Sequence, residues 1–142
     1  MFHIIYASRA VKAFSRAEFK DLLQGSRTKN ARTKVTGMLV YHESVFVQVL
    51  EGEEQCVRGI FQSIEKDPRH TSISVLRRNR PVCSNRIFGD WSMGFLDGKA
   101  DAKGLRRFIR TVTNQHLLTL REIEALDLSA LLLHQTIDCE VA

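Results

Sequence analysis

The stretch "VTGMLVYHESVFVQVLEG", residues 35–52, sets the architecture expected for this chain. Two runs of β-branched, aliphatic and aromatic residues, 35–42 and 45–50, lie on either side of a short turn at 43–44, which is the pattern of a β-hairpin. The second run contains one amide, Gln48, among large apolar neighbours. An amide buried without hydrogen-bond partners costs roughly 1–3 kcal/mol, so the sequence raises the question of what Gln48 contacts.

The residues before the hairpin predict a strand and then a helix. Residues 2–8 combine apolar residues with strong β-formers and fit a first strand. Ser15 and Glu18 have the spacing of a capping box, and apolar residues follow at helical spacing, so we expect a helix over about 16–28. The polar residues 29–34 are predicted to form a loop.

The residues after the hairpin predict a second helix and two further strands. Acidic residues directly after the hairpin suit the start of a helix, and apolar residues at i, i+3, i+4 and i+7 continue it until just before residue 67. Residues 73–77 fit a fourth strand, 79–86 a loop and 87–96 a fifth strand.

This order of elements, β-α-β-β-α-β followed by one more strand, predicts an α+β, ferredoxin-like fold with a fifth strand. The two helices would cover one face of the sheet. Helix-like patterns at 101–113 and 117–137 supply candidates to cover the other face. We therefore expect a sheet domain at 1–97 and a C-terminal helical extension at 98–142, joined by a hinge at 97–104.

Composition limits the classes of protein. The 142 residues fit one domain of ordinary size, and an apolar content of 44% is typical of a folded globular chain. The net charge of +5 is spread along the chain, which favours a solvated surface over contact with phosphates. The three cysteines and five histidines show no metal-ligand spacing, and no signal peptide or membrane-spanning run occurs. We expect a cytoplasmic protein without a membrane partner.

Taken singly, most of the polar or sulfur-containing residues in the predicted strands have structural explanations. A strand Tyr or Trp, such as Tyr6 or Trp91, usually belongs to the core with its polar tip satisfied. Met93 could fill a gap, and Asn30 could be a turn residue. Gln48 is harder to explain in this way, because glutamine is unusual between large apolar residues.

Taken together, these residues resemble the BLUF domains, sensors of blue light using flavin. The family pattern joins a first-strand tyrosine, an asparagine before an apolar-Thr-Gly strand, a glutamine three residues before Glu-Gly, an Asp-x-Arg-His after the second helix and a Trp-x-Met in the last strand. This sequence has all five features in order, over roughly residues 1–97: Tyr6, Asn30, Gln48, residues 67–70, and Trp91 with Met93.

The resemblance implies a flavin, FAD in this family with FMN as the alternative, held between the two helices on one face of the sheet. Tyr6 matches the photoactive tyrosine, and Gln48 matches the glutamine between that tyrosine and the flavin ring. Light would draw an electron from Tyr6 and a proton through Gln48, and the return would leave the hydrogen bonds rearranged. Trp91 and Met93 match the last-strand pair that reorients with the light state. The implied cofactor-binding residues are Ser26, Lys29, Asn30, Gln48, Asp67, Arg69 and His70.

Two positions depart from the family pattern: Lys29, where relatives carry His or Asn, and Pro68, in a segment that is more basic elsewhere. No catalytic or DNA-binding sequence is recognised after residue 97, so the chain resembles the short stand-alone members and is not expected to be an enzyme. Its signal would then pass to an unidentified downstream protein. A homodimer or a larger homo-oligomer is the expected assembly.

Other functions on this fold are less well supported. An acylphosphatase-type enzyme needs a backbone anion cradle, and residues 8–15 lack its glycines. No Rossmann glycine pattern supports a flavin oxidoreductase, and the third strand lacks the Gly-aromatic pattern of RNA-binding domains. The alternative is a flavin-free ferredoxin-like interaction or nucleic-acid-binding module, against which the intact pair of Tyr6 and Gln48 argues.

Overall fold

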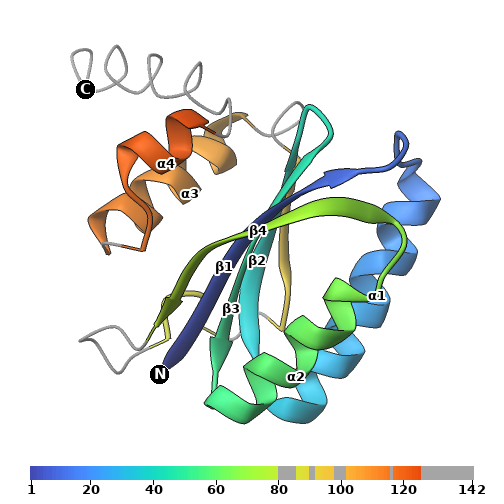
Figure 1. The fold of residues 1–142 in the computed structure, drawn as a ribbon, viewed down its shortest axis with the longest axis horizontal. Helices are drawn as coiled ribbons and strands as arrows, with labels where there is room; N and C mark the ends of the chain where they lie inside the picture. Colours follow the sequence, from blue (N-terminus) through green and yellow to red (C-terminus); the bar gives the residue numbers. More distant parts are fainter. Residues whose placement is uncertain (80–85, 90–91, 98–101, 116, 126–142) are drawn as a thin grey trace.

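The predicted hairpin forms the middle of a mixed five-stranded sheet with the strand order β4-β1-β3-β2-β5. Its strands are β2 (Thr36–His42) and β3 (Val45–Gly52), and the others are β1 (Phe2–Ala10), β4 (His70–Asn79) and β5 (Gly94–Asp97). Neighbouring strands are antiparallel, except that β5 runs parallel to β2. The computed structural model describes residues 1–79, 86–89, 92–97, 102–115 and 117–125 (Figure 1).

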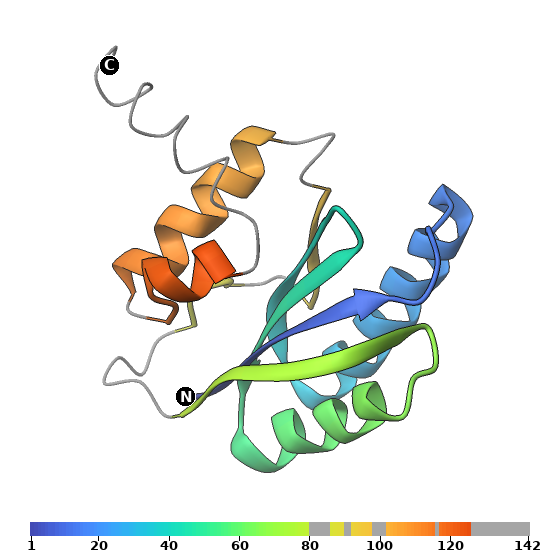
Figure 2. The same ribbon diagram turned by 45° about the horizontal axis from the view of Figure 1, so that its top comes forward.

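The helices form two layers, one on each face of the sheet (Figures 1 and 2). α1 (Arg16–Thr33) and α2 (Glu54–Glu65) cover one face, and α3 (Ala102–Asn114) and α4 (Leu120–Ala125) lie on the other. This arrangement confirms the predicted ferredoxin-like α+β fold with a fifth strand and C-terminal helices on the second face. α4 falls within the helix predicted at 117–137, and residues 126–137 of that prediction lie outside the described residues.

α1 begins as predicted but ends later than predicted. The Ser15 side chain caps its start, accepting a hydrogen bond of 3.2 Å from the backbone N–H of Glu18. The helix continues through Thr33 and is capped by Lys34 in a left-handed conformation, with φ of 54°. The loop predicted at 29–34 was therefore wrong over 29–33, because no glycine or proline interrupts the helix there. Lys29 and Asn30 consequently lie on a helix and not in a loop.

The last two strands have different bounds from those predicted. β4 is longer than the predicted 73–77, and β5 is shorter than the predicted 87–96. The backbone N–H groups of Ile87 and Phe88 donate to the Glu51 carboxylate at 2.9 and 2.8 Å instead of to a neighbouring strand. Residues 87–89 therefore run as a bend and turn. Trp91, predicted in the same strand, lies outside the described residues.

Alternation along the strands divides the apolar core into two clusters. Ile4, Tyr6 and Leu39 point to the α1/α2 face, whereas Ile5 and Val47 pack with α3 and α4. In the antiparallel register of β1 and β3, Tyr6 stands directly opposite Gln48. The strand register thus places a phenol and an amide side by side on the face covered by α1 and α2.

Gly37 in β2 lies so close to the backbone of β3 that substituting it tests the pairing of these two strands. A Cβ added to Gly37 would lie 1.9 Å from the carbonyl oxygen of Val49 in β3, so the two central strands would have to separate. We expect Gly37→Ala to lower the free energy of unfolding by about 2 kcal/mol or more, measured by urea unfolding.

Gly59 provides the matched control. It lies inside α2, and a Cβ there would meet nothing within 4 Å. Gly59→Ala should raise the free energy of unfolding by about 1 kcal/mol, because alanine is the better helix former. Equal effects of the two substitutions would contradict the described pairing of β2 with β3.

Candidate functional site

A row of three hydrogen-bonded side chains crosses the sheet on the α1/α2 face. The Tyr6 hydroxyl donates to Gln48 Oε1, and Gln48 Nε2 donates to Met93 Sδ at 3.3 Å. All three side chains are buried, with exposed fractions of 3%, 4% and 1%. Both ends of the Gln48 amide are therefore in use, one toward a strong donor and one toward sulfur, a weak acceptor. Among the described residues, the Gln48 amide therefore contacts Tyr6 and Met93.

The environment of Tyr6 keeps its phenol protonated. Burial raises the pKa of Tyr6 far above its ordinary value, and the negative charge of Asp67 adds to the effect. Its ring lies 5.4 Å from the Phe61 ring and 6.2 Å from the His70 ring, measured between centroids. The phenol is thus a permanent donor at neutral pH, and its hydrogen bond to Gln48 points along the sheet.

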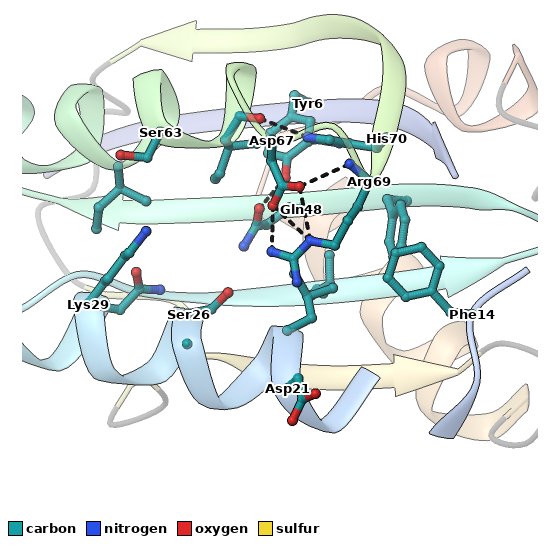
Figure 3. Close-up of a pocket in the computed structure, with 17 residues that line it drawn as sticks. Tyr6, Phe14, Asp21, Ser26, Lys29, Gln48, Ser63, Asp67, Arg69 and His70 are labelled. Atoms are coloured by element: carbon teal, nitrogen blue, oxygen red, sulfur yellow. Dashed lines mark hydrogen bonds and ion pairs between the residues drawn. The ribbon is translucent and has the colours of Figure 1, made fainter. Parts of the chain in front are cut away.

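A pocket lies above this row, between α1 and α2 (Figure 3). The space between the lining residues is about 790 Å³, open solvent at its mouth included. Its apolar walls are formed by Phe14, Leu22, Leu39, Phe46, Ile60 and Ile64, and its polar groups are Tyr6, Asp21, Ser26, Lys29, Asn30, Gln48, Ser63, Asp67, Arg69 and His70. Such a site can hold a flat, largely apolar ring with polar edges.

α1 supplies two neighbouring side chains of different character. Asn30 is buried, and its Nδ2 donates to the carbonyl oxygen of Ser92 at 2.7 Å. Lys29 is exposed, reaches into the pocket in Figure 3, and makes no ion pair with any residue that the structure describes. A cation without a protein counter-ion in a pocket is available to an anionic or electron-rich ligand atom.

Asp67 and Arg69 form an ion pair above Gln48 (Figure 3). The Arg69 Nε donates to both carboxylate oxygens of Asp67 at 2.9 and 3.0 Å, and Nη2 donates at 2.5 Å. The hydrogen bond from Arg69 lowers the pKa of Asp67 below its ordinary value, and the same bond raises the pKa of Arg69. The pair therefore stays ionised at neutral pH and orients the guanidinium within the pocket.

His70 has a hydrogen-bond partner at each ring nitrogen. Its Nε2 lies 2.8 Å from the carbonyl oxygen of Ile64, which can only accept, so Nε2 carries a proton. Its Nδ1 lies 2.7 Å from Ser8 Oγ, which can donate to it or accept from it. The ring is therefore held at both nitrogens beside Tyr6, with one edge toward the pocket.

The structure gathers most of the residues predicted from the sequence. Tyr6, Ser26, Lys29, Asn30, Gln48, Asp67, Arg69 and His70 all line the pocket. Met93 reaches the site through Gln48 from the bend before β5, and Trp91 lies outside the described residues.

Several residues around the site were not predicted. Ser8 lies on the same strand face as Tyr6, but its contact with His70 was not predicted. Arg27, whose Nε donates to the Met93 carbonyl at 2.9 Å, was missed as well. Ser63 faces the pocket from α2. Of these, only Ser8 could have been found by pattern, because it lies two residues after Tyr6 in a strand.

The described residues supply neither a metal-ligand cluster nor a helix that could cross a membrane. No group of three or more His, Cys, Asp or Glu residues there could hold a metal ion. In the same part of the chain, no helix combines the length and the apolar character that a membrane crossing requires.

Comparison with known proteins gives relatives that respond to light. Photoactivated adenylate cyclase subunit beta of Euglena gracilis is 32% identical over 90 residues, which is 63% of this chain and 10% of that protein. The chain thus spans about a tenth of the length of the curated relatives it matches. A bacterial light-regulated adenylyl cyclase structure superposes with a TM-score of 0.67 and 27% identity, covering 81% of this chain and 34% of that one.

Two further comparisons identify the family. The dark-state structure of BlrB, described as a BLUF protein, superposes with a TM-score of 0.69 and 30% identity, covering 98% of this chain and 96% of that one. The family model for sensors of blue light using FAD matches residues 1–94, which hold the whole row of Tyr6, Gln48 and Met93. The chain therefore belongs to the BLUF family, the sensors of blue light using FAD.

Proposed function

We propose that this chain is a blue-light photoreceptor that binds a flavin in the pocket between α1 and α2 and switches through the hydrogen bonds of Gln48. The observation that carries the proposal is the buried row of Tyr6, Gln48 and Met93 beneath that pocket. Residues 1–97 would form the light-sensing domain, and residues 98–142 a helical extension.

The residues of the pocket fit a flavin. The apolar walls suit the ring, and Gln48 Nε2 has a second N–H beyond the one that meets Met93. Asn30 and Gln48 would hold the polar edge of the ring. Lys29, a cation without an ion-pair partner among the described residues, would contact an electron-rich atom of the ring or of the phosphate chain. Other contacts would come from Ser26, Asp67, Arg69 and His70.

The chain's own part in the light reaction would begin at Tyr6. When bound and excited by blue light, the flavin supplies an electron acceptor. Tyr6 can then give up an electron and its hydroxyl proton together, because Gln48 Oε1 already accepts a hydrogen bond from that hydroxyl. The amide of Gln48 would take up that proton at Oε1 and give one from Nε2 to the ligand that accepted the electron. When the electron and proton return to Tyr6, Gln48 is left rotated or tautomerised.

The rearranged amide would signal through Met93. Gln48 Nε2 leaves Met93 Sδ when the amide turns, so the segment leading into β5 loses one of its contacts. Trp91 is proposed to take part in the same movement. We further propose that the chain is not itself an enzyme and acts on a downstream protein, in the cytoplasm and as a homodimer or larger homo-oligomer. The likeness to BlrB, a BLUF protein covered over 96% of its own length, supports a light-sensing role for this chain.

The first prediction concerns the cofactor. The protein, purified in the dark, should be yellow, and mass spectrometry of the flavin released by denaturation should identify FAD. Release of FMN alone would show that the bound flavin is FMN and not FAD. A colourless protein that takes up neither flavin would refute it.

The second prediction concerns the amide. Gln48→Leu removes both hydrogen-bonding ends at similar volume, so the red shift of the flavin spectrum under blue light should disappear. The flavin should stay bound with an affinity within about tenfold of the wild type, since roughly one hydrogen bond is lost. Gln62→Leu, on the exposed side of α2, is the control and should shift normally. A normal shift in Gln48→Leu would rule out the switching role of Gln48.

The third prediction concerns the phenol. Tyr6→Phe removes the proton and raises the cost of electron loss, so the quantum yield of the red shift should fall by roughly a hundredfold while the colour remains. Tyr41→Phe is the control, because Tyr41 does not line the pocket. Its ring packs against the Phe46 ring, with 5.0 Å between the ring centroids. If Tyr6→Phe cycles like Tyr41→Phe, the electron comes from another residue.

A further inference from the structure

Glu51 is a buried carboxylate that the proposed light reaction does not use. It follows Gln48 by three positions in β3, so its side chain points to the opposite face of the sheet. Its exposed fraction is 0%. A charge in such a place is costly unless it is fully hydrogen-bonded, so its partners show what it holds in place.

Glu51 accepts hydrogen bonds from two strands and from the segment before β5. His3 Nε2 lies 3.0 Å from Oε2, and Thr36 Oγ1 lies 2.8 Å from Oε1. The backbone N–H groups of Ile87 and Phe88 donate at 2.9 and 2.8 Å, one to each oxygen. The carboxylate thereby joins β1, β2 and β3 to residues 87–88.

Glu51 is ionised at neutral pH. Burial by itself would raise its pKa, but the hydrogen bonds from His3, Ile87, Phe88 and Thr36 outweigh burial and hold the pKa below its ordinary value. Backbone hydrogen bonds to a carboxylate are stronger than those to a neutral amide. Residues 87–88 are therefore held by an anion rather than by pairing with a strand.

Met93 follows Phe88 by five positions in the sequence. On the other face of the sheet, the carbonyl oxygens of Ser92 and Met93 accept hydrogen bonds from Asn30 at 2.7 Å and Arg27 at 2.9 Å. The Met93 side chain then meets Gln48. β3 thus contacts the described residues on both sides of 90–91, through Glu51 at residues 87–88 and through Gln48 at Met93.

We propose that Glu51 is a positioning residue of the photoreceptor: by fixing residues 87–88, it sets where Met93 Sδ stands relative to the Gln48 amide. The proposal rests on the light-sensing function proposed above. Sulfur is a weak acceptor, so a small displacement of the Met93 backbone would remove the contact. Dark recovery returns Gln48 to Met93 and would therefore depend on Glu51.

The test compares Glu51→Gln with the wild type in flavin-bound protein. The amide presents one acceptor oxygen and one donor nitrogen, so a donor nitrogen faces one of the two backbone N–H groups. The red shift should remain, and dark recovery should slow by roughly fivefold, which corresponds to about one hydrogen bond. In a Met93→Leu background, Glu51→Gln should change recovery less than twofold, because the contact it positions is absent.

Glu53→Gln is the matched control. The Glu53 carboxylate also accepts two backbone N–H bonds, at 3.2 Å each, but these come from Gln55 and Cys56 at the start of α2. Glu53→Gln should lower the free energy of unfolding without changing the rate of dark recovery. Equal slowing in Glu53→Gln, or an undiminished effect of Glu51→Gln in the Met93→Leu background, would overturn the positioning role and leave a purely structural one.

A readout without flavin separates this proposal from the light-sensing function. In flavin-free protein with labelled methionine methyl groups, Glu51→Gln should shift the NMR signal of Met93, and Glu53→Gln should not. An unmoved signal overturns the positioning role even if the wild type responds to light. A wild type without a light-induced shift refutes the proposed function, and with it the role in recovery.

Should Glu51→Gln fail to fold, Thr36 provides a milder change. Thr36→Val removes one donor to the same carboxylate, and Thr36→Ser retains it. Recovery should slow by roughly twofold to fivefold in Thr36→Val and match the wild type in Thr36→Ser. Identical rates in the two variants would overturn the proposal.

Discussion

The hydrogen bond between Tyr6 and Gln48 is the interaction on which the rest of the site depends. It joins two polar side chains inside an apolar layer, where each would be costly without the other. Their meeting depends on register, because a slip of one residue between β1 and β3 would send them to opposite faces of the sheet. The apolar residues on both faces of β1 and β3 oppose such a slip. Core packing therefore fixes the geometry of the polar pair.

The two faces of β3 carry different tasks within one strand. Toward α1 and α2, the strand presents Gln48 to the pocket, and toward the other face it presents Val47 and Val49 to α3 and α4. Glu51 ends the strand with an anion that holds the chain leading into β5. A strand buried on both faces is rigid. A change at Gln48 would therefore displace the bend at residues 92–93 more easily than it would displace β3 itself.

Local patterns predicted the elements that depend on local causes. The capping box located the start of α1, and the runs of apolar, β-forming residues located β1, β2 and β3. The end of α1 was missed because a left-handed lysine, Lys34, performs the role that a glycine usually signals. The strand predicted at 87–96 was too long because Glu51, far away in the sequence, takes the N–H groups of that segment.

The site was predictable to the extent that its residues form a recognisable family pattern. Tyr6, Asn30 and Gln48 belong to that pattern, whereas Ser8 and Arg27 do not. Ser8 is hydrogen-bonded to His70, which is hydrogen-bonded in turn to the Ile64 carbonyl. Arg27 donates a hydrogen bond to the Met93 carbonyl. Partners of this kind are backbone atoms or side chains distant in sequence, and no spacing rule reveals them. They become visible only when the helices are placed on the sheet.

The unequal strengths of the two Gln48 contacts indicate where a change of state is least costly. The bond from the Tyr6 hydroxyl is between strong groups in a buried setting, where hydrogen bonds are strengthened. The bond to Met93 Sδ uses a weak acceptor, so giving it up costs less than the roughly 1 kcal/mol of an ordinary hydrogen bond. In the proposed switch, a turned amide would present Nε2 to the Tyr6 hydroxyl, which would then accept, and Oε1 to Met93 Sδ, which cannot donate. The energy gap between the two proposed arrangements would then be set largely by how well Met93 is held against Gln48, which is a property of the described residues before β5 and not of the pocket.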